Sequence, residues 1–471
     1  MRRNLISTIV PSILAILGLV SVVWWMGQGP LVPLQARVPG LDRPQAGVAV
    51  EKVPLQGKLS VLDAAQPPAL PGGWPQFRGP QLDGICHDDV RLARRWPQGG
   101  PRVLWSVELG EGYAAAAIHA SRVYVLDYDR EAAADVLRCF SLDAGRELWR
   151  FSYPVVIKRN HGMSRTIPAV TDDFLVTLGP KCHALCLHPL TGTPGDTGQP
   201  YWLIDLVEQY GAKVPEWYAG QCPLIDQGKL ILAPGGEALL VALDCRTGQP
   251  IWKSDNPQGW TMTHTSVVPM EFAGRRTYVY CGKGGVAGVA ADDGRILWST
   301  TDWKISIATV PSPVVLPDGK IFFCGGYNAG SLLLQLQTEG DKIVPRTLKR
   351  MKAGEFGSTQ QTPIFYEGHL YGVREKDKQL VCLDLEGKVL WASGSQHRFG
   401  LGPYLIADKL LYVLDDSGKL TMAEATPQGY RPLDQAQVLD GHDAWGPMAM
   451  AAGRLILRDM TRMVCLDVSQ K

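Results

Sequence analysis

Short runs in which apolar and polar residues alternate follow one another from about residue 100 to the end of the chain. Segments such as FSLDAGRELW, VALDCRTGQPIW and VCLDLEGKVLW each place an Asp- and Gly-containing turn between two such runs. Alternation is typical of half-buried strands, and glycine supplies the positive φ that a tight hairpin turn requires. The pattern therefore predicts a succession of β-hairpins.

These hairpins repeat at a regular interval. A Gly-x-x-x-Trp pattern ends at Trp149, Trp202, Trp252, Trp298 and Trp391; successive Trp lie 53, 50, 46 and 93 residues apart, the last interval spanning two periods. Trp105 extends the series by 44 residues toward the N-terminus. Repeats of this length, each with about four short strands, predict an all-β fold, a β-propeller.

The ring is expected to have eight four-stranded blades. Outer strands are predicted near residues 105, 149, 202, 252, 298, 345, 391 and 438. The last repeat, LILRDMTRMVCLDVSQ, contains inner strands and lacks an outer one. We expect strand 101–110 to complete this blade, because closure of the ring removes two unpaired sheet edges.

A large planar side chain near the outer edge of a blade can fill the widening gap to the next blade. Burial of such a ring is worth several kcal/mol, and truncation to Ala typically costs about 3–5 kcal/mol. We therefore interpret six tryptophans as structural docking residues, namely Trp105, Trp149, Trp202, Trp252, Trp298 and Trp391.

The N-terminus has a different pattern. Residues 1–26 carry Arg2 and Arg3 and then an apolar run that ends in Trp24 and Trp25, which predicts a transmembrane signal anchor. A long, cleaved signal peptide is the alternative, and it implies the same compartment. Residues 27–73 are rich in Pro and are expected to form a linker, so that the propeller spans 74–471. The basic residues ahead of the run predict a single-pass protein of the inner (cytoplasmic) membrane with the propeller on the periplasmic side.

The composition argues against a nucleic-acid partner, and it does not indicate a disulfide pattern. Lys and Arg number 47 against 46 Asp and Glu, without a basic cluster, so no nucleic-acid partner is expected. The ten Cys mostly stand singly on alternating strands and are interpreted as small buried apolar residues. Some of them could still pair in an oxidising compartment, and the sequence does not give their connectivity.

The hairpin turn resembles the repeat of the pyrroloquinoline-quinone (PQQ) type propellers. The family mark L-D-x-x-T-G-x-x-x-W is best kept at Leu243, Asp244, Thr247, Gly248 and Trp252, and the opening WPQFRGPQLDG is similar to the start of bacterial extracytoplasmic members. The resemblance implies one of two functions. Quinoprotein dehydrogenases hold the quinone and Ca²⁺ in the central funnel, whereas BamB-like outer-membrane assembly factors are non-catalytic scaffolds.

The residues favour the second branch. The chain has no Cys-Cys pair, no C-x-x-C-H and no Glu/Asn/Asp set that can be aligned with a Ca²⁺ site. We therefore assign no catalytic, cofactor-binding or metal-binding residue and expect no cofactor. The alternative is a PQQ-dependent quinoprotein dehydrogenase with Ca²⁺ that oxidises alcohols or sugars.

A second series of loops, rich in aromatic and polar residues, precedes each expected innermost strand. Because innermost strands line the channel, these loops should gather at one mouth of the ring, either as turns that plug the funnel or as a recognition surface. The candidate recognition residues are Tyr113, His161, Trp217, Tyr218, Trp260, Trp303, Phe356, Arg398, His442 and Trp445. The sequence thus predicts a membrane-anchored, extracytoplasmic, non-catalytic binding or scaffold module for a protein or polymer partner, for example in envelope protein assembly.

Overall fold

The computed structural model of the chain describes residues 2–27, 55–195 and 197–470, which belong to two units, Met1–Pro54 and Leu55–Lys471. In the first unit, helix α1 covers Arg2–Gly27. No helix in the described ranges has both the length and the apolar character that a membrane span requires, so the predicted anchor is not supported by the structure. Most of the predicted linker, residues 28–54, lies outside the described residues.

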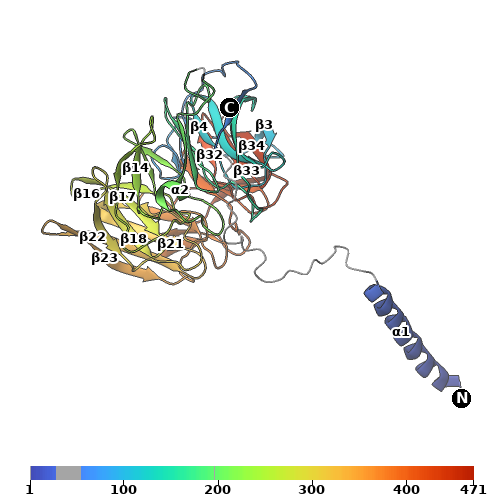
Figure 1. Cartoon of the computed structure of the whole chain (residues 1–471). Coiled ribbons are helices and arrows are strands. Elements are labelled where there is room, and N and C mark those ends of the chain that lie inside the picture. Colours follow the sequence, from blue (N-terminus) through green and yellow to red (C-terminus); the bar gives the residue numbers. More distant parts are fainter. Residues whose placement is uncertain (1, 28–54, 196, 471) are drawn as a thin grey trace, which may run out of the picture. The chain divides into compact units, whose positions relative to one another are not determined.

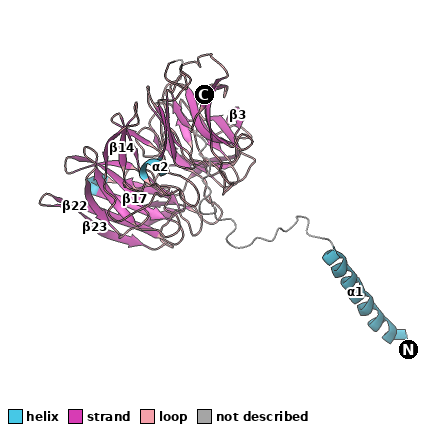
Figure 2. Cartoon of the chain, viewed as in Figure 1, coloured by secondary structure: helices cyan, strands magenta, loops and turns pink. Residues whose placement is uncertain are grey.

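The regular secondary structure of the second unit is mostly short antiparallel strands, which form eight sheets in the described residues (Figures 1 and 2). Each sheet contains four neighbouring strands that form one blade, from an innermost to an outermost strand. The prediction of an all-β, eight-bladed propeller with four-stranded blades is therefore confirmed. We number the blades I to VIII in chain order. The helical elements of this unit are α2 (Leu206–Tyr210) and a short 3-10 helix, η1 (Pro317–Gly319).

The strands of the first four blades are given from the innermost to the outermost. Blade I has β4 (Ala117–His119), β5 (Arg122–Asp129), β6 (Ala134–Ser141) and β7 (Glu147–Pro154). Blade II has β8 (Ala169–Val170), β9 (Leu175–Leu178), β10 (His183–Leu187) and β11 (Trp202–Asp205). Blade III has β12 (Leu224–Asp226), β13 (Lys229–Leu232), β14 (Val241–Asp244) and β15 (Pro250–Lys253). Blade IV has β16 (Val268–Phe272), β17 (Arg275–Gly282), β18 (Gly285–Ala290) and β19 (Ile296–Thr300).

The remaining blades follow the same order. Blade V has β20 (Val314–Val315), β21 (Lys320–Gly325), β22 (Gly330–Glu339) and β23 (Lys342–Met351). Blade VI has β24 (Ile364–Tyr366), β25 (His369–Val373), β26 (Leu380–Leu383) and β27 (Val389–Ala392). Blade VII has β28 (Tyr404–Ala407), β29 (Leu410–Leu414), β30 (Lys419–Glu424) and β31 (Pro432–Gln437). Blade VIII has β32 (Ala449–Ala451), β33 (Arg454–Arg458), β34 (Arg462–Asp467) and, as its outer strand, β3 (Arg102–Glu108).

The ring closes through β3. This strand pairs antiparallel with β34, from Arg102 opposite Asp467 to Glu108 opposite Arg462, and the two lie side by side in Figure 1. The predicted closing strand 101–110 is therefore confirmed. Seven of the eight predicted outer-strand positions fall within the fourth strand of a blade, and the eighth, near residue 438, lies one residue beyond the end of β31.

Two further strands come from the residues that precede the ring. β1 (Lys58–Val61) adds a fifth strand to blade I by pairing with β7, and β2 (Ile85–Cys86) runs parallel to β28 of blade VII. Strand β1 lies inside the range 27–73 that the sequence analysis assigned to the linker. Its sequence, KLSV, alternates in polarity and pairs with the otherwise free edge of β7. The propeller unit therefore begins ahead of Trp74.

The repeated tryptophans lie between neighbouring blades. Trp105 illustrates the contact: its indole N–H donates to the carbonyl of Leu142, on the hairpin turn of blade I, at 2.9 Å. A Cβ built at Gly145 in that turn would lie 2.7 Å from the Trp105 ring, so glycine is required there. Equivalent indole hydrogen bonds join Trp202 to Cys245, Trp252 to Ala291 and Trp391 to Thr426 in the next blade.

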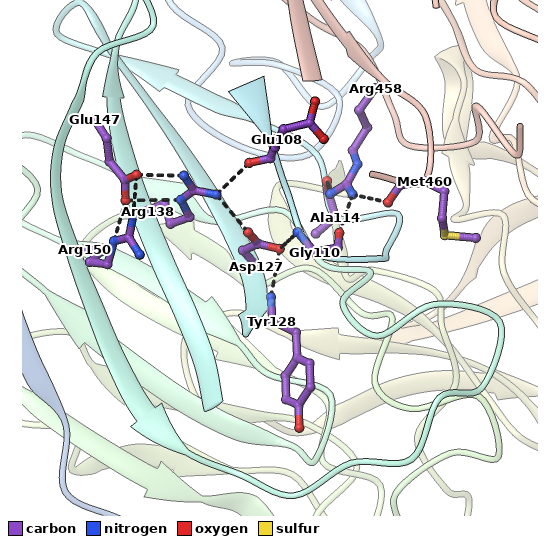
Figure 3. A network of polar contacts seen from close by, with 10 residues as sticks. All are labelled: Glu108, Gly110, Ala114, Asp127, Tyr128, Arg138, Glu147, Arg150, Arg458 and Met460. Carbon is purple, nitrogen blue, oxygen red and sulfur yellow. Dashed lines mark hydrogen bonds and ion pairs between the residues drawn. The ribbon is translucent and has the colours of Figure 1, made fainter. Parts of the chain in front are cut away.

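A polar network reinforces the junction between blades VIII and I (Figure 3). Arg138 on β6 makes an ion pair with Glu147 at 2.7 Å and with Asp127 at 3.1 Å, and it donates to the carbonyl of Glu108 at 2.8 Å. Asp127 accepts the backbone N–H of Gly110 at 2.8 Å. Glu108 is the last residue of β3, so these bonds fix the end of the closing strand onto blade I.

Arg458 on β33 continues the network from the other side (Figure 3). Its side chain is 1 % exposed and donates to the carbonyls of Gly110 (3.1 Å), Ala114 (2.8 Å) and Met460 (2.8 Å). Burial lowers the pKa of its guanidinium to about 10, which still leaves the group charged at neutral pH. Arg458 thus joins blade VIII to the segment that follows the closing strand β3.

Asp135 on β6 is a buried carboxyl group without a cationic partner. Its Oδ2 accepts a hydrogen bond from the Tyr153 hydroxyl at 2.8 Å, and its Oδ1 has no partner among the described residues. Burial raises the pKa of Asp135 to about 7, and the Tyr153 hydrogen bond only partly offsets this effect. Between pH 4 and 7 the folded protein therefore holds a proton that the unfolded chain releases, and stability falls as pH rises.

We expect Asp135→Asn to remove this pH dependence. The variant should gain stability over the native protein by about 3 kcal/mol more at pH 8 than at pH 5, because a neutral amide avoids the buried charge. Urea unfolding at the two pH values measures the difference. Asp434→Asn, at a partly exposed carboxylate of β31, is the control and should show no comparable change. An equal response of the two variants would contradict the assignment.

Candidate functional site

The segment 74–86 forms the floor of a funnel at the centre of the ring. Trp74 exchanges two backbone hydrogen bonds of 2.8 Å with Ile118 of blade I, and the carbonyl of Gly84 accepts the N–H of Ile406 of blade VII at 3.1 Å. Between these points Leu82 packs against the apolar core of blades III and IV. The segment thus contacts blades on several sides of the ring, and its residues Trp74, Phe77, Arg78 and Gly84 line the central cavity.

Arg78 holds this floor in place. Its guanidinium donates to the carbonyls of Leu82 (3.0 Å) and Asp83 (2.8 Å) in its own turn, and to those of Thr362 (2.9 Å) and Pro363 (3.0 Å) in blade VI. The side chain thus links the floor to the wall. Burial lowers the pKa of Arg78 to about 10.

One wall of the funnel is a belt of hydrogen bonds between blades. The residue two positions before an innermost strand donates its backbone N–H to the side chain at the same position of the next blade. Ile167 donates to Cys222 (3.3 Å), Cys222 to Ser266 (3.0 Å), Ser266 to Ser312 (3.0 Å) and Ser312 to Thr362 (2.9 Å). This belt runs from blade II to blade VI and presents small polar groups to the centre.

The other wall is aromatic. Tyr113 and Trp445, from the loops before β4 and β32, stack with their ring centroids 5.2 Å apart. Trp217, from the loop before β12, lies against His264 with centroids 6.5 Å apart. The belt, the floor and these rings enclose a cavity of about 480 Å³, a size typical of small-ligand sites.

Arg165 is the charged residue at the junction of the two aromatic groups. Its guanidinium lies 5.7 Å from the Tyr113 ring and 6.0 Å from the Tyr218 ring, and it lines the cavity. Burial lowers the pKa of Arg165 to about 10, so it remains a cation. Burial, together with the Arg165 charge, lowers the pKa of His264 to about 4, so that imidazole is neutral at pH 7.

The structure brings together four of the ten predicted recognition residues. Tyr113, His161, Trp217 and Trp445 line the funnel. Tyr218 lies directly behind this wall, where its hydroxyl donates to the carbonyl of Lys158 at 2.6 Å. These five residues come from blades I, II, III and VIII, so the aromatic surface covers one side of the mouth only.

The other five predicted residues lie elsewhere. Trp260, Trp303 and Phe356 are 6, 2 and 0 % exposed and pack between blades, so their prediction as mouth residues is corrected to a core role. The loops that carry them turn the rings inward, for example Phe356 against Phe322. Arg398 is exposed and donates to the carbonyl of Asp377, and His442 is exposed beside Asp443; neither lines the cavity.

Sequence reasoning missed the floor, the belt and Arg165. The signal for the belt was present: a small residue followed by Pro precedes several innermost strands, as at Cys222-Pro223, Ser312-Pro313 and Thr362-Pro363. Trp74, Phe77 and Arg78 stood in a recognised opening motif, yet nothing in the repeat indicates that this segment enters the channel. Arg165 has no counterpart at a fixed repeat position.

The donor set of the funnel does not fit a quinone held by Ca²⁺. Ca²⁺ prefers six or more oxygen ligands with several carboxylates. None of the described residues that line the cavity is Asp, Glu or Asn. Within the described ranges there is also no group of three or more His, Cys, Asp or Glu side chains placed to hold a metal ion. We therefore derive no reaction step through such a cofactor.

All ten cysteines are buried and unpaired. Burial raises the pKa of each thiol above its usual range, as at Cys222, where it is about 11. Such thiols are poor nucleophiles. The interpretation of the cysteines as buried apolar residues is confirmed, and no nucleophilic cysteine contributes to the site.

Eight four-stranded blades, docking tryptophans and a partly aromatic funnel define a PQQ-like β-propeller with a central cavity. The sequence profile of the family described as outer membrane protein assembly factor BamB matches residues 133–386, more than half of the chain. The chain belongs to this family. No curated protein sequence matches it.

Solved structures with the same fold include both branches of the resemblance. BamB from Moraxella catarrhalis has 15 % sequence identity and a TM-score of 0.52, with 78 % of this chain and 99 % of that chain covered. A europium-containing methanol dehydrogenase has 11 % identity and a TM-score of 0.57, with coverage of 82 % and 89 %. The computationally designed Ika8 protein has 11 % identity and a TM-score of 0.51, with coverage of 78 % and 99 %. At these identities the likeness establishes the fold alone.

Proposed function

We propose that this protein is a non-catalytic binding module that recognises a protein or polymer partner at the aromatic side of the funnel. The observation that carries the proposal is the half-ring of Tyr113, Trp217 and Trp445 above the floor segment, without a carboxylate in the cavity lining. These rings are half-buried, and aromatic rings at the edge of a cavity provide large contact area at low entropic cost. A carboxylate acid–base pair or a Ca²⁺ site requires carboxylate groups, which the described lining of this cavity does not supply.

The same proposal includes the location of the module at the membrane. An apolar N-terminal run behind Arg2 and Arg3 supports a membrane anchor, with the propeller outside the cytoplasm. Membership of the BamB family supports a role in envelope protein assembly. The anchor would keep the funnel close to partners at the membrane surface.

We expect the double variant Trp217→Ala plus Trp445→Ala to lose capture of the partner by at least tenfold, because two central aromatic anchors are removed. The full-length protein is crosslinked in its native envelope and purified, and captured proteins are quantified. Ile251→Ala plus Leu390→Ala, at exposed positions of the outer strands β15 and β27, is the matched control and should leave capture unchanged. Unchanged capture by the tryptophan variant would overturn the proposal.

Quinone-dependent oxidation of alcohols or sugars is tested separately. The protein is incubated with PQQ and Ca²⁺, and dye reduction is followed with both substrate classes. Turnover would overturn the non-catalytic assignment, and its absence with no bound quinone would support it.

A further inference from the structure

The cavity carries a positive charge that its own lining does not neutralise. Arg165 makes no ion pair with a carboxylate in the described part of the chain, and no Asp or Glu lines the cavity. Two acidic residues in the loops that carry Tyr113 and Trp445 have partners of their own. Glu111 pairs with Arg159, and Asp443 lies 3.3 Å from His442.

The Arg165 guanidinium is positioned by its own loop. Nη2 donates to the carbonyls of Asn160 (2.6 Å) and His161 (3.1 Å), and Nη1 lies 3.3 Å from that of Met163. Its Nε–H has no hydrogen-bond acceptor among the described residues. The orientation of the cation is therefore fixed while one donor stays free for a ligand.

Aromatic rings surround this cation. Its guanidinium lies 5.7 Å from the ring of Tyr113, which stacks on Trp445, and 6.0 Å from the ring of Tyr218. Trp217, beside the neutral His264, lines the same cavity. A fixed cation between two aromatic surfaces in a mostly apolar cavity matches an anionic group attached to an apolar body.

We propose that the funnel binds a carboxylate carried on an aromatic or apolar body, with the carboxylate at Arg165 and the body between Trp217 and the Tyr113–Trp445 pair. This inference rests on the proposed function and specifies the chemistry of the group recognised. Two sources can supply it, a small organic acid or the C-terminal end of a polypeptide.

Calorimetric titration of the full-length protein with matched acids and amides tests the proposal. The probes are 2-naphthoate against 2-naphthamide, and the peptide N-acetyl-Ala-Ala-Phe as its free acid against its amide. At least one acid should bind at least tenfold more tightly than its amide. If the peptide acid alone binds, the source is a chain end; if naphthoate binds as well, a small acid suffices.

Variants test whether Arg165 causes the preference for the acid over the amide. Arg165→Met should abolish the difference between acid and amide, and Arg165→Lys should retain part of it, because Lys keeps the charge without the planar fork. Arg431→Met, at an exposed arginine that pairs with Glu424 in blade VII and does not line the cavity, should keep the full difference. Urea midpoints verify that each variant is folded.

The result that overturns the inference is equal binding of acid and amide by the native protein, or a preference that survives Arg165→Met. If partner capture then still depends on Trp217 and Trp445, the proposed function stands and the anionic ligand does not. If the double tryptophan variant binds both probes and its partners as the native protein does, both proposals fail.

Discussion

Trp105→Ala is expected to lower the free energy of unfolding by about 3–5 kcal/mol. The substitution removes a buried indole that lies over the Gly145 turn of blade I and donates to the carbonyl of Leu142. Because Trp105 is on the closing strand β3, the loss falls on the junction that holds the ring together. Urea unfolding of the full-length protein, followed by far-UV circular dichroism, measures it.

Val103→Ala is the control for this prediction. Val103 lies on the same strand with half of its side chain exposed, so its truncation should cost about 0.5 kcal/mol or less. Similar losses for the two variants would mean that β3 contributes through backbone pairing alone. The docking role of Trp105 would then be rejected.

Arg78→Met is expected to cost about 3 kcal/mol and to release the funnel floor. Four backbone carbonyls lose their cationic donor, and two of them, those of Thr362 and Pro363, belong to blade VI. Amide hydrogen exchange of residues 74–86 should accelerate at least tenfold, while the strands of blades III and IV remain protected. Hydrogen exchange with mass spectrometry resolves these regions.

Arg102→Met provides the matched control for the floor. The Arg102 side chain is largely exposed in its ion pair with Asp467, so the cost should be within about 1 kcal/mol and the exchange of residues 74–86 unchanged. A floor that stays protected in Arg78→Met would show that the pairing of Trp74 with Ile118 is sufficient to hold it.

The propeller was predictable because its signals are periodic. Turn glycines and tryptophans recur once per blade, so a degenerate copy such as β23, which has no tryptophan, can be placed by interpolation between Trp298 and Trp391. The closing strand was predictable for a similar reason, because the last repeat lacks an outer strand and one additional strand precedes the first repeat. Periodicity therefore determines blade number and the positions of the outer strands.

The site was less predictable because it breaks the repeat. Loops of similar sequence send Trp217 and Trp445 into the funnel and Trp303 and Phe356 into the core, and the choice depends on packing between blades. Trp303 lies against Phe323 of its own blade, a contact that composition does not indicate. Arg165 and the floor segment depend on tertiary placement, and no local pattern encodes it.

The pairing of β3 with β34 also sets a condition on synthesis. Glu108 and its partner Arg462 are more than 350 residues apart in sequence. At ribosomal rates of about 5–20 residues per second, the VLWSVEL segment waits roughly 20 to 70 s before its partner exists. During that interval an apolar strand edge is open to wrong pairing. Blade VIII can therefore form only after β34 has been synthesised, so ring closure is a late step in the folding of this propeller.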